Sequence, residues 1–281
     1  MRVLNLGAGV QSTTLYLWAI DGELQIDYAV FADTQSEPRA VYEHVDFLKT
    51  LGGPEIITAT AGSLARNLVE GVNSTGQRFV SIPAFLDVNR RGKPDGIGRR
   101  QCTREYKIDV IERVIRERLG LAKGQRVPPD VHITQIMGLS FDEPARMIRV
   151  RDQFRGRKQW HVELPLFDEF VTRTDCLAYL AKRLPGRKVP RSACSFCPFH
   201  DDNEWIDLRD NDPEAWSEAV QIDHAIREET SACQVGMESK QYLHRSCVPL
   251  DEVQLRPTPP DQQKRMTFSV SEQDCLGYCG R

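Results

Sequence analysis

The chain has 281 residues, of which 40% are hydrophobic and 27% are charged, and its formal net charge at pH 7 is −3. This composition excludes extensive disorder and indicates one large or two modest folded domains. The opening MRVLNLGAGV is interrupted by glycine too early for a signal peptide, and no apolar run approaches the roughly 20 residues of a membrane span. We therefore expect a cytoplasmic protein without membrane contact. Its eight cysteines should then serve metal, cluster or redox chemistry rather than structural disulfides.

The first half of the chain alternates predicted strands with predicted helices. Apolar runs predict strands at residues 3–6, 27–33, 55–60 and 131–139. Between them, helices are predicted over 12–20 with Ser12 as the N-cap, over 38–53 between a proline and two glycines, and after Ser63 as a second N-cap. This alternation predicts an α/β fold with a parallel sheet, helices on both faces, and ligands at the carboxyl ends of the strands.

Three loops follow predicted strands and carry the candidate binding residues. In LGAGVQS, Gly7 and Gly9 would let the backbone approach a phosphate, and Ser12 would donate its hydroxyl at a helix amino terminus. In ADTQSEP, Asp33 and Glu37 would reach a ribose hydroxyl or a magnesium ion. The third loop, GLSFDEPAR, adds further candidates: Asp142, Glu143 and Arg146.

Taken together, G-x-G-x-x-S, A-D-T-x-x-E and G-x-S-x-D-E-x-x-R resemble the PP-loop, or adenine nucleotide α-hydrolase, superfamily, and within it the phosphoadenosine phosphosulfate (PAPS) reductase family. The resemblance implies a Rossmann-like nucleotide-binding domain over 1–165 and a mainly helical, cysteine-bearing region over 166–281. It also implies that the first loop holds the phosphates of ATP, APS or PAPS. One position departs from the usual S-G-G-x-D-S, because Gln11 stands where an acidic residue precedes the serine. Gln11 is expected to bind the nucleotide together with the other residues of this loop.

The stretch RSACSFCPFH contains a C-x-x-C pair, Cys194 and Cys197. The pair alone fits zinc, an iron–sulfur cluster or a thiol–disulfide couple, of which the last is least favoured because no thioredoxin-like strand–helix junction precedes it. Cys102, in a basic segment before a predicted helix, is the candidate third ligand. A structural zinc would instead use these three cysteines and His200.

The family resemblance favours a [4Fe–4S] cluster on Cys102, Cys194 and Cys197. Members with such a cluster carry a Cys-Cys pair where this chain has Gln101-Cys102, so the fourth iron ligand is an open position or a tail cysteine, Cys275 or Cys279. Cys279 also resembles the tail nucleophile of sulfonucleotide reductases. The remaining cysteines are predicted to be structural or inert: Cys176, Cys233 and Cys247.

The implied activity is sulfur transfer or reduction on an adenine nucleotide or sulfonucleotide, with a sulfur donor or thiol reductant as the second partner. The alternatives are ATP-dependent adenylation and thiolation of a nucleic acid or other acceptor, and a zinc-stabilised nucleotide-binding module without catalysis. Residues 87–107 and 144–158 are basic and suit an anionic ligand, whereas the acidic stretch 200–230 disfavours bulk nucleic-acid binding. A homodimer is compatible with these features. His44, His132 and His224 are expected to be structural, and His244 and Arg245 are open candidates for contact with the nucleotide.

Overall fold

The computed structural model describes residues 1–76, 81–87, 96–228 and 239–257. Five of its strands form one parallel sheet in the order β3-β2-β1-β6-β7. They are β1 (Arg2–Asn5), β2 (Tyr28–Asp33), β3 (Ile56–Thr60), β6 (Ile133–Met137) and β7 (Trp160–Glu163). The predicted α/β class and its four strands are confirmed, and β7 is an additional edge strand.

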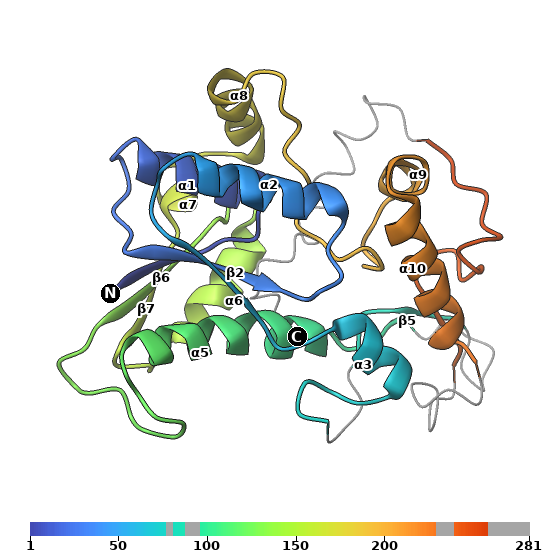
Figure 1. Ribbon diagram of the computed structural model, residues 1–281, viewed down its shortest axis with the longest axis horizontal. Helices are drawn as coiled ribbons and strands as arrows, with labels where there is room; N and C mark the ends of the chain where they lie inside the picture. The colour runs from blue at the N-terminus through green and yellow to red at the C-terminus, as the bar shows by residue number, and fades with distance from the viewer. Residues whose placement is uncertain (77–80, 88–95, 229–238, 258–281) are drawn as a thin grey trace.

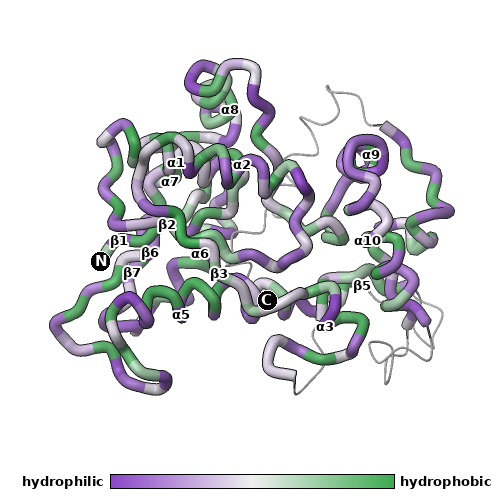
Figure 2. The backbone as a smooth tube through the Cα atoms, viewed as in Figure 1, coloured by the Kyte–Doolittle hydropathy of each residue, from purple (hydrophilic) through white to green (hydrophobic). Residues whose placement is uncertain are grey.

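Helices cover both faces of this sheet (Figure 1). One face carries α1 (Val10–Ile20), α2 (Arg39–Thr50), α7 (Pro165–Asp168) and α8 (Arg173–Arg183), and the other carries α5 (Asp109–Arg118) and α6 (Pro144–Phe154). Because successive strand side chains point to opposite faces, Val3 packs with the α5 and α6 side while its neighbour Leu4 packs with the α1 and α8 side. The alternation of apolar and charged residues along α5 is visible in Figure 2.

Two helix starts test the predicted caps. Ser63 is the N-cap of α3 (Leu64–Glu70), and its hydroxyl accepts a hydrogen bond of 3.2 Å from the Arg66 amide, as predicted. The predicted cap at Ser12 is wrong, because α1 begins at Val10 with Gly9 as its N-cap. Ser12 occupies the third helical position, and its hydroxyl accepts from the Gly9 amide at 3.2 Å. Ser12 therefore lies in the first turn of α1 and not at its N-cap.

A second hydrophobic cluster lies beside the sheet domain. It joins α3, α9 (Asp202–Asn211) and α10 (Pro213–Ala225) around the fully buried Trp205. A small antiparallel sheet, with strand order β5-β4-β8, adjoins it: β4 (Phe85–Leu86), β5 (Gly96–Ile97) and β8 (Gln241–Tyr242). The cluster thus combines segments near residues 64–106 with segments near 196–250, while α7 and α8 pack on the parallel sheet. Packing crosses the predicted boundary at 165 in both directions.

The structure shows the surroundings of the cysteine and histidine residues that were predicted to be structural. Cys176 is fully buried on α8 in the apolar cluster that contains Leu15 and Leu180, as expected of a core residue. His44 is buried on α2 and its Nε2 lies 3.0 Å from the Thr13 hydroxyl. Desolvation, with a smaller effect of Arg187, lowers the pKa of His44 to about 4, so the ring is neutral at pH 7. His132 precedes β6 rather than lying on it. No helix within the described part of the chain is long and apolar enough to cross a membrane.

Candidate functional site

The sheet order places a topological switch point between β1 and β6. From β1 the chain proceeds outward to β2 and β3, and it then returns to the other side of β1 to add β6 and β7. Ligands of open parallel sheets bind outside the carboxyl ends of the strands at such a point. The first loop follows β1 and the third loop follows β6, so both predicted binding loops meet there.

Close backbone approaches shape the first loop. Ala8 lies in the left-handed region with φ of +58°, a conformation that favours glycine, and its methyl group is fully buried. A side chain on Gly9 would bring its Cβ to 3.1 Å from Ser192 Cβ, and one on Gly138 would bring its Cβ to 2.8 Å from the Ser12 amide nitrogen. The loop after β6 and the segment around Ser192 therefore both pack directly against the start of α1.

A small, partly open pocket lies at this start of α1. It is lined by backbone and side chains of the first helical turn and by three residues from later in the chain: Gly9, Val10, Gln11, Ser12, Arg173, Arg191 and Ser192. Two arginines at a helix amino terminus favour an anion, because the helix dipole and the guanidinium groups are all positive. The Ser192 hydroxyl is buried and has no hydrogen-bond partner among the described residues. The pocket thus brings together the Ser192 hydroxyl and two guanidinium groups, of which Arg191 also pairs with Glu204.

The third loop supports this pocket from behind. The Glu143 carboxylate accepts hydrogen bonds from the Ser140 amide and hydroxyl, each at 3.1 Å, and pairs with Arg146. The side chains of Glu143 and Arg146 are only 1% and 3% exposed, which separates Arg146 from the pocket lining. Asp142 accepts from the Arg173 amide at 3.1 Å and fixes the first residue of α8. Asp142, Glu143 and Arg146 remain predicted ligand residues, but their observed contacts are with the protein.

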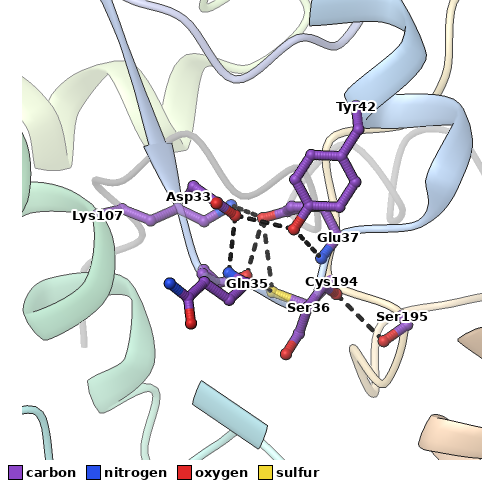
Figure 3. Close-up of polar contacts among 9 residues, drawn as sticks. Asp33, Gln35, Ser36, Glu37, Tyr42, Lys107, Cys194 and Ser195 are labelled. Carbon is purple, nitrogen blue, oxygen red and sulfur yellow. Dashed lines mark hydrogen bonds and ion pairs between the residues drawn. The ribbon is translucent and has the colours of Figure 1, made fainter. Parts of the chain in front are cut away.

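The second loop carries Asp33 and Glu37 at the end of β2 (Figure 3). Asp33 Oδ1 accepts from the Gln35 amide at 2.7 Å and from the Tyr42 hydroxyl at 2.9 Å. Burial and the Asp33 carboxylate raise the pKa of Tyr42 above its usual value, which keeps this hydroxyl a donor. Glu37, with a side chain 1% exposed, pairs with the similarly buried Lys107 at 3.2 Å.

The C-x-x-C segment docks onto the second loop. Cys194 Sγ lies 3.2 Å from the Thr34 hydroxyl and 3.7 Å from Glu37 Oε1. The neighbouring Ser195 donates both its amide, at 2.7 Å, and its hydroxyl, at 3.1 Å, to the Ser36 carbonyl. The Cys197 amide bonds back to the Cys194 carbonyl at 3.0 Å, which closes a tight turn. Residues 192–195 therefore connect the pocket at the start of α1 to the end of β2.

Cys102 lies on α4 (Gln101–Thr103), which continues through the π-helical turn η1 (Arg104–Ile108) into α5. Two contacts bring this helix to the C-x-x-C segment. The Arg100 guanidinium stacks 4.2 Å above the Phe199 ring, and Lys107 reaches the same Glu37 carboxylate as Cys194. Cys102 and Cys194 border one hydrophobic cluster. The predicted third ligand is thus in the neighbourhood of the pair.

The described residues contain no group of three or more His, Cys, Asp or Glu side chains arranged to hold a metal ion. The [4Fe–4S] cluster and the alternative zinc therefore both stay predictions. Cys233, Cys275 and the predicted nucleophile Cys279 lie outside the described residues.

The histidine candidates have protein contacts. The alternative zinc ligand His200 packs edge-on against Trp205 with ring centroids 4.6 Å apart, and desolvation holds its pKa well below the usual value. His224 Nε2 pairs with Asp251 at 3.0 Å. His244 and Arg245 both contact Asp202 Oδ1 at 3.3 Å, with the His244 side chain buried, so the structure ties them to α9.

Sequence reasoning missed three residues of the pocket, Arg173, Arg191 and Ser192, as well as Lys107. Arg191 and Ser192 stand in the quoted stretch RSACSFCPFH, directly before the cysteine pair, so their position was a usable signal. Arg173 follows Thr172, which caps α8 and accepts from the Asp175 amide. Its place beside the first loop depends on contacts across 162 residues, such as the one it makes with Gln11.

Comparisons with known proteins found no matching family model, no matching curated protein and no matching solved structure.

Proposed function

We propose that this chain is an enzyme that binds an adenine nucleotide or sulfonucleotide with its phosphate or sulfate in the pocket at the start of α1. The observation that carries the proposal is the pocket itself, where Arg173, Arg191 and the buried Ser192 hydroxyl surround a helix amino terminus. Its position at the switch point of the β3-β2-β1-β6-β7 parallel sheet is the usual site of ligand binding in such folds. The adenine base is proposed from the resemblance of the three loops to PP-loop proteins.

The proposed chemistry is sulfur transfer or reduction beside the C-x-x-C segment. In the reductive form, a tail thiolate, proposed to be Cys279, attacks the sulfur of a bound sulfonucleotide. The sulfur–oxygen bond to the nucleotide breaks and the nucleotide leaves with the electron pair. A thiol reductant then attacks the Cys279 sulfur of the thiosulfonate, forms a disulfide with it and releases sulfite, so that two thiols are oxidised for each sulfonucleotide reduced. The closeness of Cys194 to Thr34 and Glu37, at the end of the strand next to β1, supports sulfur chemistry near the pocket. The proposed [4Fe–4S] group would be held by Cys102, Cys194 and Cys197 and would supply an electron-rich, thiolate-bound iron centre there.

Replacing Arg173 with methionine is expected to weaken binding of ATP, APS and PAPS by about 1–3 kcal/mol, because a charged hydrogen bond to phosphate is lost. Isothermal titration calorimetry measures the effect. Arg183→Met is the matched control, since Arg183 lies on the same helix but pairs with Asp21 at 2.9 Å on the surface. Equal affinities of the wild type and Arg173→Met would place the phosphate elsewhere.

Metal content separates the cluster enzyme from a zinc-stabilised module. We expect protein purified without oxygen to contain iron and to show a broad visible thiolate-to-iron band that Cys102→Ala, Cys194→Ala or Cys197→Ala each abolishes. Cys247→Ala is the control that keeps the band. Cys279→Ala distinguishes a nucleophile, which retains the band and loses turnover, from a ligand, which loses both. One bound zinc and no iron would contradict the cluster proposal.

A further inference from the structure

Gln11 links the pocket to the third loop through its side-chain amide. Its Oε1 accepts from Arg173 Nη1 at 2.7 Å, while its Nε2 donates to Glu143 Oε2 at 3.1 Å and to the Ser140 hydroxyl at 3.3 Å. Gln11 is 3% exposed and lies on the first turn of α1. Arg173 lines the pocket, so this amide connects a pocket cation to a buried carboxylate.

The chemistry of the two neighbours fixes the orientation of the amide. Arginine can only donate hydrogen bonds and an ionised carboxylate can only accept them. A carboxamide has one oxygen and one NH₂ group, so a single orientation satisfies both partners. An ionised carboxylate at the same position would face Glu143 with like charge and would have no proton to donate. The side chain needed between Arg173 and Glu143 therefore has one acceptor end and one donor end.

We propose that Gln11 is a positioning residue that holds the Arg173 guanidinium at the pocket, where it meets the phosphate of the ligand. This inference rests on the proposed function, because the position of Arg173 matters for binding only if its guanidinium contacts the phosphate. A neutral amide orients the guanidinium without neutralising it. An ionised acidic residue at position 11 would pair with Arg173 and compete with the bound phosphate for the same cation.

The surroundings of Gln11 define what would titrate in a variant. The charged groups near it come from three parts of the chain. Glu143 and its partner Arg146 come from the third loop and α6, and Asp142 of the same loop accepts from the Arg173 amide. Arg173 comes from α8, and Arg191 lines the same pocket. Glu143 is the carboxylate in direct contact with the amide, and its partner Arg146 is buried with it.

The substitution Gln11→Glu provides the sharpest test because a protonated carboxyl group imitates the amide. Its carbonyl oxygen accepts from Arg173 and its O–H donates to Glu143. When the proton is lost, two carboxylates face each other and Arg173 gains a competing counter-ion. We therefore expect affinity for ATP, APS or PAPS near the wild-type value at about pH 5, and a loss of about tenfold or more at pH 8 relative to wild type at the same pH.

Gln11→Leu and a double variant complete the design. Gln11→Leu should weaken nucleotide binding at every pH. The double variant Gln11→Leu with Arg173→Met should bind no more weakly than Arg173→Met alone, because Gln11 is proposed to act only through Arg173. Gln221→Glu is the matched control, because Gln221 is exposed on α10 and its side-chain amide donates to the Ser217 hydroxyl at 3.4 Å. Thermal unfolding of each ligand-free variant, over the same pH range, reports any loss of fold.

The outcomes separate this inference from the proposed function. If the wild type binds none of the three nucleotides, the proposed function fails and the inference falls with it. If the wild type binds and Arg173→Met weakens binding, but Gln11→Glu follows the wild-type affinity from pH 5 to pH 8, the inference alone is overturned. A pH-dependent loss confined to Gln11→Glu, with non-additive Gln11→Leu and Arg173→Met effects, supports it.

Discussion

Replacing Lys107 with methionine is expected to lower the free energy of unfolding by about 3–5 kcal/mol. Lys107 and Glu37 form an ion pair of 3.2 Å whose side chains are only 8% and 1% exposed. Removing the ammonium group leaves the Glu37 carboxylate buried. The Thr34 hydroxyl, at 3.2 Å, and the weakly donating Cys194 thiol still contact it. Urea denaturation of the purified variant measures the change.

Two further variants show whether burial causes this effect. Lys49→Met removes an ion pair of nearly the same length, 3.1 Å to Asp46, but both of its partners are exposed. That change should cost about 0–1 kcal/mol. The double variant Lys107→Met with Glu37→Gln should recover most of the lost stability, because no uncompensated charge remains. A Lys107→Met protein as stable as Lys49→Met would contradict this explanation.

Replacing Gly9 with valine is expected to abolish nucleotide binding, a loss of about 100-fold or more, while the protein stays folded. The backbone of Gly9 is extended, with φ of −99°, so a side chain is compatible with its conformation. The added Cβ would lie 3.1 Å from Ser192 Cβ and 3.3 Å from the Ser192 amide, so the further methyl groups would occupy the pocket. Calorimetry measures binding and circular dichroism checks the fold.

Gly9→Ala provides the graded comparison. It adds the Cβ without the two methyl groups, and Ser192 has to shift by only a few tenths of an ångström, so it should weaken binding less than Gly9→Val. Wild-type affinity in a folded Gly9→Val protein would remove the first loop from the binding site.

The fold elements that sequence patterns predicted are those whose signal is local. The strands at 3–6, 27–33, 55–60 and 131–139 are apolar runs bounded by turn residues, and each corresponds to a strand of the parallel sheet. The cap at Ser63 was also readable from its neighbours. The N-cap of α1 could not be read from the sequence, because Gly9 and Ser12 both suit an N-cap. In the structure the helix begins earlier, after Gly9, where the loop packs against Ser192 and Gly138. The edge strand β7 is four residues long and alternates too briefly to give a clear pattern.

The sequence predicted only the part of the candidate site that consists of loops at the ends of parallel strands. The carboxyl ends of parallel strands share one edge, so the glycine loop and the second and third loops were expected to meet. Arg173 reaches Gln11 across 162 residues of chain, and Lys107 reaches Glu37 across 70. Such contacts depend on how α8 and η1 pack, which periodicity does not encode. For the same reason the sequence pointed to Arg146 as a phosphate ligand, whereas packing buries its side chain against Glu143.

A crystal structure of the protein with ATP, APS or PAPS bound tests the central claim most directly. The account predicts a phosphate or sulfate oxygen within about 2.7–3.2 Å of Arg173, Arg191 and the Ser192 hydroxyl, at the amino terminus of α1. It also predicts that Gln11 keeps its contacts with Arg173 and Glu143 in the complex. A nucleotide bound with its phosphates away from the start of α1, and with these three side chains unengaged, would contradict it.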